Sequence, residues 1–148
     1  MQAICEGLQG LVSDLQVAPC PTLLKLGAVQ HLSTPIQAHL CPGRSVLDGL
    51  EALHPTPAVG GLPKAGALHF IRRHEGFDRG WYAAPVGWLD NQGNGDFVVA
   101  LRSALLTPQG CHLFAGCGIV QGSRPANEYE ETQIKLTSME QALALAQR

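Results

Sequence analysis

The sequence lacks a strong charge of either sign, a long apolar run and any closely spaced cysteine pair. Ten Lys and Arg residues face twelve Asp and Glu residues, for a net charge of −2, so no basic surface for nucleic acid or an anionic membrane is expected. No apolar stretch approaches the roughly 20 residues that span a bilayer. The amino terminus has no charged segment followed by an apolar one, so we expect no secretory leader.

Cysteine usage also excludes a disulfide-stapled scaffold. The five cysteines are Cys5, Cys20, Cys41, Cys111 and Cys117, an odd number without a CxxC pair. A chain of 148 residues with 45% apolar residues does not need such staples, so we interpret them as reduced thiols of a cytosol-like compartment. Cys117 lies between two glycines and is the thiol expected near a site, with a buried bystander as the alternative.

Apolar spacing, prolines and glycines predict an α+β chain. We expect helices over 1–16, 45–53, 63–75 and from Asn127 onward, extended pieces over 23–36, and strands over 81–89, 97–106 and 112–120. Hairpin-like connections would join the three strands into an antiparallel meander. Ser45 with Asp48 is a predicted helix start, and the compact turn over 58–61 allows close approach to a ligand.

Charged residues gather at the predicted start of the last helix. Asn127 is a good N-cap, and Glu130 follows three residues later as in a capping box. From this start, Glu128, Glu131 and Lys135 have the i, i+3 and i+4 spacing of one helix face. Two carboxylates there could bind a hard divalent cation through oxygen. The alternative is a solvated, charged first turn.

The middle strand, predicted over 97–106, carries an arginine among small apolar residues. Period-two alternation places Arg102 on the face shared with Val98 and Ala100, and Tyr82 could line it from the neighbouring strand. Such an arginine is either a snorkelling edge residue or a buried ligand clamp. An isolated histidine such as His31 is usually structural or exposed.

Five ordered segments resemble the chorismate-utilising enzymes, and the isochorismate synthases in particular. They are VQHLSTPI at 29–36, LHPTPAVGGLPKAGAL at 53–68, RGWYAAPVGWLD at 79–90, VALRSAL at 99–105 and GCGIVQGSRPANEYEETQIK at 116–135. The resemblance covers nearly the whole chain. It implies a fold of antiparallel β-sheet with helices packed outside, in which 1–148 forms the carboxy-terminal part of one chorismate-binding catalytic domain.

The resemblance also implies roles for individual residues. Glu128 and Glu131 match the acidic pair that holds Mg²⁺, ligating directly or through water. Arg102 and Tyr82 match residues that contact the enolpyruvyl carboxylate of chorismate. The remaining implied substrate-binding positions are His31, Ala58, Gly116, Gly118 and Lys135.

Ala58 bears on the reaction. Amine-forming relatives, and also salicylate-forming ones, tend to have threonine at the matching position, whereas isochorismate synthases have alanine in HPTPAVGG. The resemblance therefore implies water as nucleophile, loss of the ring hydroxyl and isochorismate as product, within quinone, siderophore or salicylate biosynthesis. Ala84 and Cys117 depart from the family pattern by small changes in size.

The resemblance places the general base lysine, the general acid glutamate and a further metal-binding glutamate in an amino-terminal half, so no catalytic residue is assigned within this chain. We expect the chain alone to be inactive, with chorismate, isochorismate and that missing half as its partners. Cytoplasm is the expected location, or plastid stroma if a transit peptide preceded the parent. The alternatives are a non-catalytic chorismate-binding remnant, a split-site partner, or an amine-forming or salicylate-forming relative.

Overall fold

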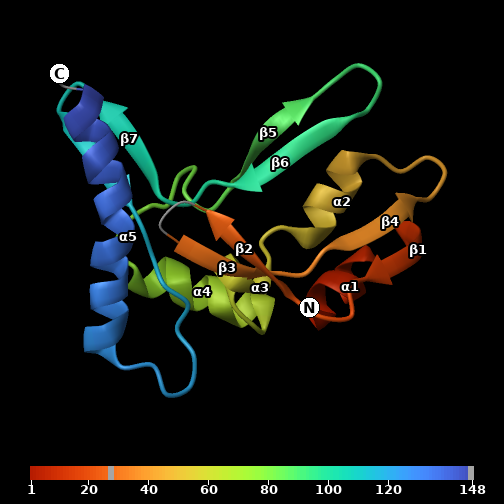
Figure 1. Cartoon of the computed structure of the whole chain (residues 1–148), viewed down its shortest axis with the longest axis horizontal. Helices are drawn as coiled ribbons and strands as arrows, with labels where there is room; N and C mark the ends of the chain where they lie inside the picture. The colour runs from red at the N-terminus through yellow and green to blue at the C-terminus, as the bar shows by residue number, and fades with distance from the viewer. Residues whose placement is uncertain (27–28, 147–148) are drawn as a thin grey trace. The chain divides into compact units, whose positions relative to one another are not determined.

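A computed structural model describes residues 1–26 and 29–146 (Figure 1). The chain forms two compact units: Met1–His54 with Asp90–Asn94, and Pro55–Leu89 with Gly95–Arg148. The assignment of 1–148 to one part of a single domain stays a prediction.

The first unit begins with a shorter helix than the apolar spacing predicted. Helix α1 covers Gln2–Leu8, and strand β1 follows at Val12–Val17, so the expected helix over 1–16 is wrong in its second half. Gly10 has φ of +76°, which a helix cannot accommodate, and the chain turns there. The apolar residues after the turn serve a strand instead.

Two separate pairs of antiparallel strands follow in this unit. Strand β1 pairs antiparallel with β4, Ile36–Leu40, while β2, Thr22–Leu26, pairs antiparallel with β3, Val29–Ser33. The extended pieces expected over 23–36 are thus confirmed at 23–26, at 29–33 and at Ile36, whereas positions 27–28 lie outside the described residues. His31 lies on β3, opposite Leu24.

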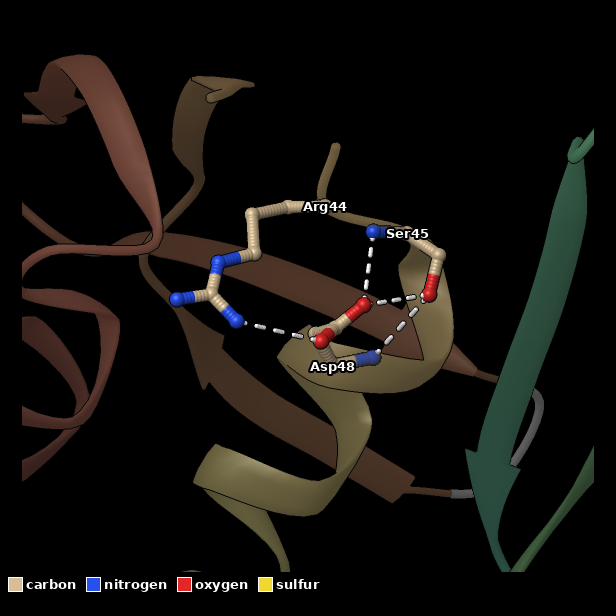
Figure 2. A network of polar contacts seen from close by, with 3 residues as sticks. All are labelled: Arg44, Ser45 and Asp48. Atoms are coloured by element: carbon tan, nitrogen blue, oxygen red, sulfur yellow. Dashed lines mark hydrogen bonds and ion pairs between the residues drawn. The ribbon is translucent and has the colours of Figure 1, made fainter. Parts of the chain in front are cut away.

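Helix α2, Val46–Leu53, starts as predicted. The Asp48 amide donates to Ser45 Oγ at 3.3 Å, and the Ser45 amide donates to Asp48 Oδ2 at 2.8 Å, which completes a capping box (Figure 2). Arg44 adds an exposed contact to Asp48 at 3.5 Å. The Ser45 hydrogen bonds, and then the Arg44 charge, lower the pKa of Asp48. Pro55 follows the last residues and prevents the helix from continuing.

In its described residues the second unit contains three helices and two antiparallel hairpins. Its elements are α3 Pro57–Gly60, α4 Lys64–His74, β5 Pro85–Leu89 with β6 Gly95–Val99, β7 Ser103–Thr107 with β8 Gly110–Phe114, and α5 Pro125–Ala146. Every strand pair in the described residues is antiparallel, which confirms the predicted α+β class.

The predicted meander is broken in its middle strand. β6 ends at Val99, the Leu101 amide bonds back to the Val99 carbonyl at 2.8 Å, and Arg102 adopts φ of +49°. A residue with left-handed φ cannot continue a strand, so the chain starts a new hairpin at β7 instead. Arg102 therefore lies in the break and not on the expected strand face.

Tyr82 is also not on a strand. β5 begins at Pro85, and the residues before it form turns in which the Tyr82 amide donates to Arg79 O at 2.8 Å. At the other end of this region, β8 stops at Phe114, well before residue 120. The predicted strands 81–89 and 112–120 are therefore correct in only part of their length.

Helix α5 begins two residues before the predicted cap. Its first backbone bond runs from the Glu128 amide to Arg124 O at 3.1 Å, and Pro125 is its first residue. Proline suits this position because its missing N–H would have no helical partner there. Asn127 lies within the first turn, so its assignment as N-cap is wrong. The helical spacing of the residues after it is unaffected.

Few apolar side chains are buried. Among the described hydrophobic residues only Leu8 and Ala83 count as buried, while Trp81 is 81% exposed and Leu32 75%. Each sheet has two strands, and an isolated hairpin is marginally stable in water. The hairpins thus present open edges and apolar faces. None of the described helices has both the length and the apolar character that a membrane span requires.

Candidate functional site

A cavity of about 260 Å³ in the second unit collects residues from segments far apart in the sequence. It is lined by Ala58, Val59, Glu75, Phe77, Arg79, Tyr82, Ala83, Leu101, Ala115, Gly116, Cys117, Gly118 and Lys135. Five of the substrate-binding positions implied by the sequence are among them: Ala58, Tyr82, Gly116, Gly118 and Lys135.

Lys135 attaches helix α5 to the segment that follows β8. Its Nζ donates to the Gly116 carbonyl at 3.0 Å and lies 2.5 Å from Glu131 Oε1. The Glu131 side chain is 52% exposed, so its other oxygen remains within reach of solvent. Lys135 thus joins an acidic residue of the helix to the glycine-containing edge of the cavity.

Glu128 faces the same edge. Hydrogen bonds from the Ser123 hydroxyl and then from the Cys117 thiol lower the pKa of Glu128. For Cys117, burial is the largest cause of a raised pKa, and the Glu128 carboxylate adds to it. The helix face predicted from spacing therefore does turn toward the segment 116–118. Neither Glu128 nor Glu131, however, lines the cavity itself.

The two glycines beside Cys117 differ. A Cβ placed on Gly116 would lie 2.8 Å from Tyr82 Oη, so any side chain would displace the phenol. A Cβ on Gly118 would meet no described atom within 4 Å. Gly116 is needed for close packing of the phenol, whereas the space beside Gly118 is open.

Tyr82 is held by its ring. It stacks on Phe114 with centroids 5.5 Å apart at 19°, and the Arg79 guanidinium carbon lies 5.8 Å from its centroid. Burial raises the pKa of the Tyr82 phenol, and the Arg79 charge opposes this effect. The phenol is therefore a neutral donor throughout the physiological pH range.

Arg79 is a site residue that the sequence analysis missed. Its Nε donates to Glu75 Oε2 at 2.7 Å, its Nη2 donates to Glu75 Oε1, and its Nη1 donates to the Val59 carbonyl at 3.0 Å. The i, i+4 spacing of Glu75 and Arg79 was the available signal. It was hidden because Gly76 ends the helix between them.

Two implied residues are not among those that line the cavity within the second unit. Arg102 does not line the cavity, although its neighbour Leu101 does. His31 belongs to the first unit, on β3. Their roles toward a substrate stay predictions.

Few side chains in the described residues could bind the expected Mg²⁺. In the described part of the chain no three His, Cys, Asp or Glu side chains gather as a metal-binding group. Glu128 and Glu131 offer two carboxylates on one helix face, and carboxylate oxygen is the donor that Mg²⁺ prefers. The Mg²⁺ assignment stays a prediction.

Comparison with known proteins identifies relatives over nearly the whole chain. A family model described as "Chorismate binding enzyme" matches residues 1–144. The salicylate biosynthesis isochorismate synthase of Pseudomonas aeruginosa is 57% identical over 97% of this chain and 30% of its own length. The isochorismate synthase MenF of Bacillus subtilis is 53% identical over 88% of this chain and 28% of its own. The chain thus spans about 30% of the length of these curated relatives.

Solved structures agree. The crystal structure of DhbC from Bacillus anthracis is described as that of a 2,3-dihydroxybenzoate-specific isochorismate synthase. It superposes on this chain with a TM-score of 0.91 at 36% identity, and the match covers 97% of this chain and 39% of DhbC. Anthranilate synthase component I of Streptococcus pneumoniae superposes with a TM-score of 0.83 at 33% identity, covering 92% and 32%. The antiparallel arrangement expected from the resemblance is therefore the fold of this chain.

The contact between Glu128 and Cys117 predicts a measurable change in thiol reactivity. Because a raised pKa lowers the thiolate fraction, Glu128→Gln should speed alkylation of Cys117 several-fold at pH 8, where the native thiol is mostly protonated. Mass spectrometry of the Cys117 peptide gives the rate, and Glu130→Gln on the same helix is the matched control. Equal rates in the native chain and Glu128→Gln would show that the contact is absent.

Proposed function

The chain belongs to the chorismate binding enzyme family, and we propose that it forms the chorismate-binding part of an isochorismate synthase. The product would be isochorismate, formed by addition of water to the chorismate ring and loss of the ring hydroxyl. The curated relatives compared above are named isochorismate synthases, which supports this choice within the family.

One observation carries the proposal. Ala58, Tyr82, Gly116 and Lys135 come from three of the five matching segments and line one cavity. Each had been assigned to substrate binding from its motif alone. A chance gathering of four such positions is a poor explanation, because the segments are separated by tens of residues. In this cavity the neutral Tyr82 phenol and the Lys135 ammonium would donate to a carboxylate of chorismate.

Mg²⁺ fits the chemistry of the donor set that Glu128 and Glu131 provide. Magnesium is commonly held by one or two carboxylates together with water and substrate oxygens, so two protein carboxylates suffice. When bound, the ion would act as a Lewis acid toward the ring carboxylate. Lys135 already neutralises Glu131 in this structure, so we propose that the lysine turns to the substrate when the metal is present.

A second proposal concerns what the chain needs for activity. Its sheets have two strands each, and large apolar side chains such as Trp81 and Leu106 are exposed. The relatives are about three times as long. We therefore propose that a further polypeptide segment covers these faces and supplies the general acid and base, each typically worth about a hundredfold to ten-thousandfold in rate. A non-catalytic chorismate-binding module is the alternative.

Reconstitution tests the proposed reaction. We expect purified 1–148 with chorismate and Mg²⁺ to form no isochorismate above the metal-only background. Addition of the part of the Pseudomonas aeruginosa relative that the match leaves out should produce turnover, measured by chromatography. Glu131→Gln should abolish it, whereas Glu130→Gln, an exposed change on the same helix, should not.

Two results would contradict this account. Turnover by the unaided chain that disappears in Glu131→Gln would show that an acid and a base lie within these residues. The second result is a lack of turnover when 1–148 is mixed with the remaining part of the relative, although the intact relative is active under the same conditions. It would show that this chain does not supply its part of the site.

Ala58 gives a specificity prediction in the reconstituted pair. Ala58→Thr adds a hydroxyl and a methyl inside the cavity, where a displacement of about 1 Å can reduce a rate about a hundredfold. We expect a loss of that order in isochorismate formation, followed by chromatography that resolves all products. Ala126→Thr, at an exposed position of α5, is the control. An unchanged rate with isochorismate as sole product would remove Ala58 as the determinant.

A further inference from the structure

The Arg79 side chain makes three hydrogen bonds within the protein. All three of its nitrogens donate: Nε and Nη2 form a fork on the Glu75 carboxylate, and Nη1 reaches the Val59 carbonyl. The Arg79 and Glu75 side chains are 25% and 28% exposed, well below the 47% of Arg44 in the surface pair with Asp48. The hydrogen bonds to Glu75 raise the pKa of Arg79 further above its already high value. Its charge is therefore permanent and already matched by the Glu75 carboxylate.

The contacts of Arg79 join two walls of the cavity. Val59 follows Ala58 in α3, a single turn whose last carbonyls lie beyond the reach of its own helical bonds, and Arg79 donates to the carbonyl of Val59. On its other side the guanidinium lies over the Tyr82 ring at 5.8 Å. Glu75 is the C-cap of α4, so the fork attaches both walls to the end of that helix.

We propose that Arg79, held by Glu75, is a positioning residue that sets the separation between the turn carrying Ala58 and the phenol of Tyr82. A planar fork fixes its direction at two points, and the third donor then has one place to go. Naming chorismate as the ligand rests on the proposed function, whereas the positioning role rests on the contacts alone.

Lysine cannot reproduce this geometry. Arg79→Lys keeps the charge and most of the length of the side chain but loses the planar fork. Because one ammonium group cannot reproduce both the fork on Glu75 and the bond to Val59, we expect the bond to Val59 to be lost. Glu75→Gln keeps Arg79 and removes the carboxylate that orients it. Arg44→Lys is a matched control, because Arg44 also pairs with an acidic residue at i+4 but at an exposed helix start (Figure 2).

The experiment uses the 148-residue chain in three measurements. Amide hydrogen exchange by NMR follows Val59, Gly60 and Gly61, whose amides donate to Thr56 and Pro57 carbonyls. We expect exchange there to rise about tenfold or more in Arg79→Lys and Glu75→Gln, since a hydrogen bond to a charged group is worth at least that factor. Amides of β7 and β8 should not change, which separates a local loss from unfolding.

The second measurement reads Tyr82 directly. The chain has two tyrosines, so Tyr129→Phe leaves Tyr82 alone for an ultraviolet titration of tyrosinate. Arg79→Gln removes the cation over the ring, and the Tyr82 midpoint should move to higher pH. Arg44→Gln should leave it in place. A merely structural arginine, remote from the phenol, would not shift this midpoint.

The third measurement is chorismate binding to each chain by calorimetry. We expect Arg79→Lys to raise the dissociation constant for chorismate about tenfold and Arg44→Lys to leave it unchanged. If the native chain does not bind chorismate, the proposed function fails, and the exchange and titration results still decide the role of Arg79. Unchanged exchange at Val59–Gly61 together with an unchanged Tyr82 midpoint would overturn the positioning role.

Discussion

The second unit is held around its cavity by a few charged hydrogen bonds and not by an apolar core. Among its described hydrophobic residues Ala83 alone counts as buried. Arg79 joins α3, the end of α4 and Tyr82, while Lys135 joins α5 to Gly116. Hydrogen bonds to charged groups are stronger than neutral ones, and a bidentate pair also fixes geometry. The hydrogen bonds of Arg79 and Lys135 therefore connect the elements that form the walls of the cavity.

Local signals in the sequence predict local structure well. The capping box at Ser45 forms because its partners are three residues apart, and α2 starts there without help from the rest of the chain. The hairpin of β7 and β8 closes at Thr107–Gly110 for the same reason. The first helix fails because Gly10 at left-handed φ interrupts an apolar pattern that alone would fit a longer helix.

The breaks in the predicted meander have a different origin. Arg102 adopts a left-handed φ, which a sequence pattern does not predict for a residue other than glycine. The alternation of apolar residues therefore predicted one continuous strand. For the site, Tyr82 and Ala58 line one cavity, and their roles toward a substrate stay predictions; the strand pattern gave Tyr82 the wrong element, since it lies in a turn. Arg79 escaped because its role depends on the Val59 carbonyl, twenty residues away, and no pattern in the sequence connects them.

The central proposal is that the chain binds chorismate in this cavity. The most direct test is an NMR titration of the isotopically labelled chain with chorismate in the presence of Mg²⁺. The account predicts saturable shifts of the Ala58, Tyr82, Gly116 and Gly118 amides, with benzoate at equal concentration producing none of comparable size. Shifts confined to residues outside the cavity, or equal shifts with benzoate, would contradict it.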